Sequence, residues 1–378
     1  KVSSAGCEVE YQITVKDEEK SIVSGLNYCL KNEPEYLLVT GGLGPTDDDV
    51  TREVLFSYMK TESIFDSEYW SVLTGRYKQA GLGISESLKS QALVPKTGEV
   101  ITNPKGSARG FKFIKNYTVI IVLPGVPMEM KSMFSQFILP SIIKKMKEPI
   151  FSKTLRTTGI PESKLFGFIK SWDNIDKNKI GYYPSIYGVD IKISNRKPEE
   201  INLFVDWIYE NFKNDIYGEN NTSIEDNIVN YCIKKNKKLA VAESCTGGLI
   251  GDRITNIPGS SEIFNGGVIV YSNDSKVNIL GVDIETIDQF GAVSENTAKN
   301  MAENVKNMFN SSFGLSVTGI AGPSGGSEEK PVGLVYIGLA SEKKSTVEKF
   351  NFGKDRKINK IKTSQAAMNT LRKGLLNE

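Results

Sequence analysis

Hydrophobic and polar residues follow two different periods in the first part of the chain. Alternation with a period of two over residues 8–15 predicts a strand, and helical spacing over 17–32 predicts a helix. The short apolar run 36–39 predicts a further strand, which enters a glycine-rich loop. The acidic run that follows this loop predicts the start of a helix over 47–59.

The same order of elements recurs at 117–137. A buried strand over 117–123 ends at Pro124 and Gly125, and a helix pattern follows around 128–137. Strands that lead into loops and then helices predict an α/β fold with a mostly parallel sheet. Ligands of such sheets bind at the carboxyl ends of the strands.

The pattern changes between about 151 and 217. One strand and one helix are followed by two strands around 181–194 and a helix over 199–212. This order predicts a small α+β unit, in which we identify no catalytic group of residues. The polar stretch 220–223 predicts a linker and a helix cap.

An α/β pattern returns from residue 223. Strands are predicted at 238–243 and 264–271, and a final helix at 356–376. The fold class is therefore α/β, with two three-layer α/β domains joined by a small α+β connector domain. The predicted domains are 1–148, 149–219 and 220–378.

Composition narrows the class of protein. The hydrophobic fraction is 39%, and no apolar run approaches the roughly 20 residues of a membrane helix. We therefore expect a cytoplasmic protein without membrane contact. A net charge of +2 gives no broad basic field, so direct nucleic-acid binding is not expected. The four cysteines are far apart, and we expect free thiols.

The chain contains no histidine. This absence excludes Ser-His-Asp triads, Cys-His dyads and histidine metal sites. A nucleophile in this protein needs another base, for which lysine is the leading alternative. A metal ion would be held by carboxylates and water.

The strand at 239–243 runs into Ser244, Cys245, Thr246, Gly247 and Gly248 before a helix. A hydroxyl at such a turn lies near backbone N–H groups that can bind an anion or an oxyanion. An ordinary serine helix cap with a glycine-rich turn is an equally good interpretation of this segment alone.

Two further segments lie at strand ends. Tyr271 and Lys276 follow the strand at 264–271, and either side chain could reach a site there or simply lie at the surface. The loop that starts at Thr318 is rich in backbone donors but has neither a Walker A nor a dinucleotide-binding spacing. Gly-rich loops of this kind are more often only turns.

Together these segments resemble the C-terminal domain of the CinA family, the nicotinamide mononucleotide deamidases. The resemblance rests on six ordered motifs and covers nearly all of the chain from Ser223 onward. The motifs are AESCTGG at 242–248, PGSS at 258–261, GG at 266–267 with YSN at 271–273 and Lys276, GAVS at 291–294, TGIAGP at 318–323, and KPVG at 330–333.

The resemblance implies a role for each of these residues. Ser244 would be the nucleophile, Lys276 its base and Tyr271 a neighbour of the pair, with Cys245 a weaker candidate nucleophile. The amides of Cys245 and Thr246 are candidates for the oxyanion hole, and Arg356 for the phosphate contact. No cofactor is expected for the deamidase. The remaining candidate substrate-binding residues are Gly247, Gly248, Asn273, Thr318, Gly319, Ala321 and Gly322.

A second candidate site lies in the first domain. The loop with Gly41, Gly42, Gly44 and Thr46 could bind phosphate, and Asp48 and Asp49 could hold a divalent metal ion. Simple capping of the following helix by the aspartates is the alternative, and for any single match it is preferred.

The run GGLGPT at 41–46, QALVP at 91–95, NPKG at 103–106 and LPGVPMEM at 123–130 resemble the MoaB/MogA-related domain of CinA proteins over about 1–148. This domain is associated with molybdopterin-type binding, and in CinA proteins with metal-dependent ADP-ribose pyrophosphatase activity. Its opening strand and a Gly-Thr-Glu-Leu loop are not found before Lys1, so part of this site is expected to be missing. The further site candidates that carry over are Asn103, Gly125 and Glu129.

The expected function is hydrolysis of nicotinamide mononucleotide to nicotinic acid mononucleotide and ammonia. ADP-ribose cleavage by the first domain is a second expectation. The alternatives are a competence or DNA-damage accessory protein and a molybdopterin-binding protein without hydrolase activity. The expected partners are small nucleotides, and two small active domains on one chain favour a homodimer.

Overall fold

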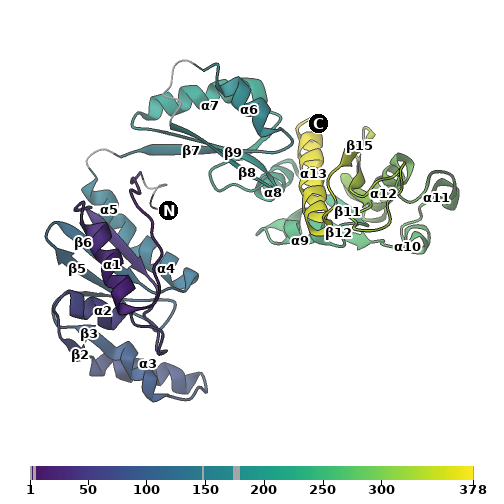
Figure 1. Ribbon diagram of the computed structural model, residues 1–378. Helices are drawn as coiled ribbons and strands as arrows, with labels where there is room; N and C mark the ends of the chain where they lie inside the picture. Colours follow the sequence, from purple (N-terminus) through teal and green to yellow (C-terminus); the bar gives the residue numbers. More distant parts are fainter. Residues whose placement is uncertain (1, 3–5, 147–148, 173–178, 378) are drawn as a thin grey trace. The chain divides into compact units, whose positions relative to one another are not determined.

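The computed structural model describes residues 2, 6–146, 149–172 and 179–377 (Figure 1). It divides into two compact units, Lys1–Ile150 and Phe151–Glu378. The second unit contains two separate sheets. No described helix is long and apolar enough to span a bilayer.

The sheet of the first unit has the order β1-β6-β5-β4. Only β1 and β6 are parallel, while β5 is antiparallel to both β6 and β4. The expectation of a mostly parallel sheet is therefore wrong for this unit. The reason is the two-residue turn between β5 and β6, which is too short for a crossover connection. The strands are β1 (Tyr36–Thr40), β4 (Glu99–Ile101), β5 (Gly110–Lys115) and β6 (Thr118–Leu123).

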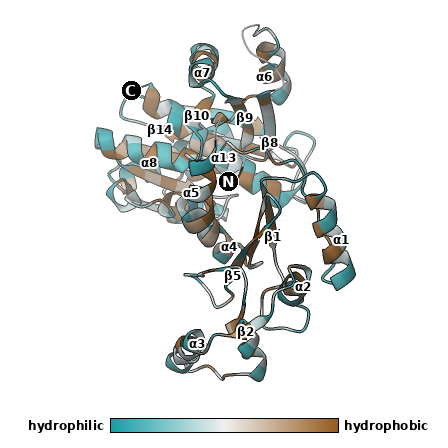
Figure 2. Ribbon diagram, turned by 90° about the vertical axis from the view of Figure 1, so that its left-hand side faces the viewer, coloured by the Kyte–Doolittle hydropathy of each residue, from teal (hydrophilic) through white to brown (hydrophobic). Residues whose placement is uncertain are grey.

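Helices cover both faces of this sheet, which makes three layers. One face packs against α1 and α2, and the other packs against α4 and the helical turns after it. The hydropathy colouring in Figure 2 shows teal and brown bands along α1, as an amphipathic helix requires. The helices are α1 (Glu19–Leu30), α2 (Thr51–Tyr58), α4 (Pro127–Met133), a π-helical segment (Phe134–Ile138) and α5 (Leu139–Lys145).

A smaller part of this unit lies between α2 and β4. It contains a two-stranded antiparallel pair and a helix with an Asp66 cap, whose side chain accepts from the amide of Tyr69. Its elements are β2 (Ser63–Phe65), α3 (Ser67–Gln79), a 3₁₀ helix (Glu86–Ala92) and β3 (Leu93–Pro95).

Two predicted elements of the first unit differ from the structure. Residues 8–15 form no strand, because no described strand pairs with them, and their apolar side chains Val9, Tyr11, Ile13 and Val15 are 42–51% exposed. The acidic run 47–49 lies in a turn, because the amide of Asp49 donates to Thr46 and α2 begins only at Thr51.

The second unit begins with the predicted α+β part. Its antiparallel sheet has the order β10-β7-β9-β8, and buried residues alternate along β9 because one face packs against α6 and α7. The elements are β7 (Phe151–Thr157), α6 (Glu162–Ile169), β8 (Ile180–Ser185), β9 (Gly188–Asn195), α7 (Pro198–Phe212) and β10 (Ile216–Glu219).

The rest of the second unit has a five-stranded sheet of order β12-β11-β13-β14-β15. Neighbours β12, β11 and β13 are parallel, and β14 and β15 are antiparallel to their neighbours. The strands are β11 (Leu239–Glu243), β12 (Phe264–Ile269), β13 (Phe313–Gly319), β14 (Leu334–Ala340) and β15 (Ser345–Asn351).

Helices again cover both faces of the five-stranded sheet. The group α8, α9 and α13 packs on one face and α12 on the other. A reciprocal capping box of Ser223 and Asp226 starts α8, as the linker stretch predicts. The helices are α8 (Ile224–Lys235), α9 (Leu249–Thr255), a 3₁₀ turn (Ser260–Glu262), α10 (Asn273–Asn278), α11 (Ile284–Phe290), α12 (Glu295–Met308) and α13 (Arg356–Leu376).

The α+β part is attached to α13. Arg372 is buried, and its guanidinium donates to the carbonyl oxygens of Asn214 and Ile216, which precede and begin β10. A buried cation that satisfies two loop carbonyls fixes this junction, because breaking it would leave buried polar groups unpaired.

Candidate active site

Ser244 and Lys276 meet at one edge of the five-stranded sheet. Ser244 directly follows β11 and Lys276 lies in α10 after the neighbouring parallel strand β12. The Lys276 Nζ donates to the Ser244 Oγ at 3.1 Å, and only 1% of Lys276 is exposed. Nζ also donates to the carbonyl oxygens of Val270 (3.0 Å) and Tyr271 (3.3 Å).

Burial lowers the pKa of Lys276, and the Cys245 thiol opposes this shift as a smaller effect. A neutral amine has two N–H groups and one lone pair. The charged form donates to all three oxygens. In the neutral form the two carbonyls take the two N–H groups, so the bond to Ser244 reverses and the lone pair accepts the hydroxyl hydrogen. The pair therefore has the geometry of a serine with a lysine base.

The turn after β11 places Ser244 outside helix α9. The amide of Ser244 donates to Val317 on β13, and Gly247 and Gly248 both have positive φ (62° and 95°). Gly248, not Ser244, occupies the cap position before Leu249. The structure thus rejects the ordinary helix-cap interpretation of this serine.

The carboxylate of Glu243 closes the start of α9. Its two oxygens accept from the amides of Gly248 (3.0 Å), Ile250 (3.1 Å) and Gly251 (2.8 Å), and the residue is 1% exposed. Three charge-assisted hydrogen bonds hold the turn in place. These amides are consequently not available to a ligand.

Cys245 and Thr246 lie between the serine and the glycines. Burial raises the pKa of the Cys245 thiol to about 12, so it stays protonated. The amides of Cys245 and Thr246 donate to no main-chain carbonyl in the described ranges. The buried Thr246 hydroxyl also has no partner among the described residues. The turn therefore retains unused donors beside Ser244.

Arg356 starts α13 and reaches the strand end that carries Lys276. Its two terminal nitrogens donate to the carbonyl oxygen of Gly322 and to the Tyr271 hydroxyl, both at 2.7 Å. The Tyr271 side chain is 59% exposed, and only its backbone oxygen contacts Lys276. Asn273 is exposed at the start of α10.

The loop after β13 lies beside Arg356, at the same edge of the sheet as Ser244. We call this edge, with Arg356 and the loop, the rim of the site. Thr318 is buried, and its hydroxyl donates to Ala292, so it supports a neighbouring loop. Gly319 ends β13, and the carbonyl oxygen of Ala321 accepts from the buried Asn359 of α13 at 3.0 Å. Asn359 therefore ties this loop to the helix.

The glycine-rich loop of the first unit lies at the carboxyl end of β1. Gly41 donates through its amide to Leu123, and a Cβ on Gly125 would lie 3.2 Å from the Cα of Gly41. A Cβ on Gly42 would lie 2.1 Å from the Thr51 hydroxyl, so α2 packs directly against the loop. The structure thus brings Gly41 and Gly125 together.

Asp49 braces this loop internally. Its carboxylate accepts from the amide (3.1 Å) and hydroxyl (2.5 Å) of Thr46, and a Cβ on Gly44 would contact it. Asp48 is exposed. Within the described ranges, no three Asp, Glu, Cys or His side chains gather as a metal site.

Asn103 and Glu129 form a separate contact. The Asn103 amide donates to Glu129 at 2.7 Å, and the Asn103 carbonyl accepts from the amides of Lys105 and Gly106. Buried Arg52 donates to the carbonyls of Leu43 and Gly44, so it also supports the glycine-rich loop.

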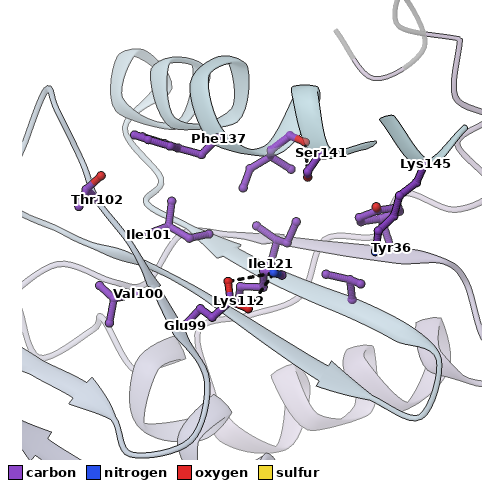
Figure 3. A pocket seen from close by; sticks show the side chains of 12 residues that line it. Tyr36, Glu99, Val100, Ile101, Thr102, Lys112, Ile121, Phe137, Ser141 and Lys145 are labelled. Atoms are coloured by element: carbon purple, nitrogen blue, oxygen red, sulfur yellow. Dashed lines mark hydrogen bonds and ion pairs between the residues drawn. The ribbon is translucent and has the colours of Figure 1, made fainter. Parts of the chain in front are cut away.

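A recess of about 360 Å³ in the first unit lies elsewhere. It is lined by Tyr36 and Val119 at the amino ends of β1 and β6. In Figure 3, Phe137 and Ser141 face Ile101 and Ile121 across it. This recess is at the opposite end of the parallel strands from the predicted loop.

Two protein-family models match this chain, one in each of its two compact units. Residues 221–375 match the family described as "CinA C-terminal domain", and 1–144 match "Probable molybdopterin binding domain". A competence-damage inducible protein of Caldicellulosiruptor saccharolyticus is 37% identical over 100% of this chain and 93% of its own length. The chain belongs to the CinA family.

One further relative is similar over most of the chain, and a solved structure is similar over less than half of it. A competence-damage inducible protein of Halothermothrix orenii is 39% identical over 97% of this chain and 90% of its own. A solved structure of a competence/damage inducible protein from Agrobacterium tumefaciens is 38% identical. It covers 41% of this chain and 94% of its own, with a TM-score of 0.40.

Two residues at the C-terminal site of this CinA-family chain have structural roles that the sequence analysis missed. Glu243 belongs to the AESCTGG motif, where its position before a glycine-rich helix start was the available signal. Asn359 lies three residues after Arg356, and that spacing was the signal that the two share a helix face.

Proposed function

We propose that the C-terminal domain hydrolyses the carboxamide of nicotinamide mononucleotide to the carboxylate and ammonia. The hydrogen bond between Ser244 and the buried Lys276 carries this proposal. A serine activated by a lysine suits acyl transfer from an amide. Because the chain contains no histidine, Lys276 is the candidate base for Ser244 at these strand ends.

The first half of the proposed reaction forms an ester. The Ser244 Oγ attacks the amide carbon while the neutral Lys276 takes the hydroxyl proton. The oxyanion that develops is stabilised by the amides of Cys245 and Thr246, which have no carbonyl partner among the described residues. Protonated Lys276 gives its proton to the leaving nitrogen, so ammonia departs as the C–N bond breaks.

The second half restores the enzyme. A water molecule loses a proton to Lys276 and attacks the ester carbon. The bond to the Ser244 Oγ then breaks, and the oxygen recovers its proton from Lys276. The products are the free carboxylic acid, which ionises, and the original serine. No cofactor is needed for either half.

Positive charge at the rim favours a mononucleotide as the substrate, because a mononucleotide carries a phosphate group. Arg356 lies beside the Gly319–Gly322 loop and contacts Tyr271. A guanidinium in this position favours a ligand with a phosphate group. Gly247, Gly248 and Asn273 lie on the adjoining turn and helix and complete the proposed binding surface.

The experiment is an ammonia and mass-spectrometric assay of the full chain with a panel of pyridine nucleotides. Wild-type protein should convert nicotinamide mononucleotide, and Ser244→Ala should reduce turnover by at least about 10³-fold without unfolding. The exposed Ser261→Ala is the matched control and should behave like wild type. Absence of deamidation of every tested carboxamide by the wild type would reject the proposal.

For the N-terminal domain we propose binding of a phosphate-containing ligand at the Gly41–Thr46 loop. The family match and the contact of Gly41 with Gly125 support it. Metal-dependent ADP-ribose cleavage is the finer proposal, with Asp48 as the more exposed carboxylate for the ion. Asp48→Asn should remove such cleavage without changing deamidation, and unchanged cleavage by Asp48→Asn would contradict it.

A competence or DNA-damage accessory role is the alternative suggested by the relatives' names. Filter retention of duplex DNA at increasing salt separates it from the enzyme proposal. Strong retention that falls with salt would favour the accessory role, since phosphate contacts release counterions. The net charge of +2 argues against that outcome.

A further inference from the structure

We infer that Lys360 is the principal contact for the phosphate group of the substrate, with Arg356 holding the rim of the same site. This inference rests on the proposed function and deepens it, because it assigns a phosphomonoester as the group recognised at the second end of the ligand.

Lys360 lies over the turn that carries the nucleophile. A Cβ added to Gly247 would be 3.6 Å from the Lys360 Nζ. The charge of Lys360 also acts on the thiol of Cys245, whose pKa it lowers against the larger effect of burial. The ammonium group is therefore close to the Ser244–Gly248 turn.

The half-buried Lys360 has no protein partner in the part of the chain that the structure describes. Glu243, the acidic residue of this turn, is committed to three amides of α9. Arg356 has used both terminal nitrogens on Gly322 and Tyr271. Lys360 is thus a cation at this rim whose charge no carboxylate neutralises.

The amides of Gly247 and Gly248 cannot supply this phosphate contact. The amide of Gly247 donates to the Ser244 carbonyl, and the amide of Gly248 donates to Glu243. Glu243 therefore already occupies the amides of Gly248, Ile250 and Gly251 at the start of α9, where helices commonly bind phosphate. An anion near Gly247 depends on side-chain charge.

The chemistry of Lys360 fits a phosphomonoester. Lysine binds phosphate as a compact point charge, and a phosphomonoester carries a charge of about −1.5 to −2 near pH 7. Arg356 lies four residues earlier on α13, on the same side of the helix, and adds to the positive field. A riboside has no phosphate group, so this positive field does not increase its binding affinity.

The test measures steady-state deamidation of nicotinamide mononucleotide and of its riboside by the full chain. Lys360→Met should raise KM for the mononucleotide about 10- to 100-fold and change kcat less than about threefold. It should leave kcat/KM for the riboside unchanged. Lys360→Arg should recover most of the affinity, and the exposed Lys357→Met is the control that should match wild type.

Equal loss for both substrates, or no loss for the mononucleotide, would overturn the inference. A phosphate-specific loss in Arg356→Met with none in Lys360→Met would overturn it as well. Calorimetry with ribose 5-phosphate separates this result from failure of the proposed function, because it needs no turnover. Binding that is weakened by Lys360→Met supports the phosphate contact even if no carboxamide is hydrolysed, and binding unaffected by this change rejects it.

Discussion

The amine of Lys276 lies 3.1 Å from the hydroxyl of Ser244, although 32 positions separate the two residues. Two parallel strands bring them together, and burial of the lysine prepares its amine for proton transfer. This relationship makes the pH dependence of the proposed reaction predictable.

Deamidation should rise with pH along a single ionisation limb. Burial lowers the pKa of Lys276 from its ordinary value of about 10.4, and only the neutral amine accepts the serine proton. Rate measurements between pH 5 and 10 check this, and a flat profile would contradict it. Lys276→Arg cannot deprotonate in this range and should be nearly as inactive as Lys276→Ala.

The pH dependence of unfolding should differ between Lys276→Met and wild type, because the methionine removes the penalty of a buried ammonium group. The folded pKa is lowered, so the unfolded chain binds more protons between the folded pKa and about 10.4. The penalty of the buried amine is therefore full below the folded pKa and disappears as pH rises toward 10.4. Denaturant unfolding at several pH values should show the difference between variant and wild type shrinking with pH.

Cys245 should be chemically inert in the folded protein. Burial raises the pKa of its thiol to about 12, so little thiolate forms below pH 9. Iodoacetamide at pH 8 should leave deamidation intact, and Cys245→Ala should keep most of the turnover that Ser244→Ala loses. A larger loss in Cys245→Ala would identify the thiol as the nucleophile.

Glu243→Gln should destabilise the protein by about 1.5–3 kcal/mol. The carboxylate accepts three amide hydrogen bonds at the start of α9, and a glutamine would place an NH₂ group against at least one of those donors. Thermal unfolding measures the change. Glu262→Gln, at an exposed position, is the control, and equal stability of the two variants would contradict the assigned role.

The sequence was sufficient to predict elements whose signals are local. The bounds of α13 are those expected, and Asp355 accepts from the amide of Ile358 to start this helix. The pairing of Ser244 with Lys276 was expected only from the resemblance to the CinA family. It agrees with the sheet, in which the ends of the neighbouring parallel strands β11 and β12 share one edge.

Features that depend on distant partners were beyond local patterns. Residues 8–15 alternate as a strand does, yet a strand needs a paired neighbour, and none of the described strands pairs with them. The position of Lys360 beside Gly247 depends on how α13 packs over a turn more than 100 positions earlier.

Helix α13 joins two places that are far apart in the second unit. Its first turns carry Arg356 and Lys360. Near its end, Arg372 donates hydrogen bonds to the carbonyl oxygens of Asn214 and Ile216. A helix of 21 residues is about 30 Å long and resists compression. The α+β part and the strand ends beside Ser244 are therefore linked through one stiff helix, and an axial displacement of α13 would move Arg356 and Lys360 with it.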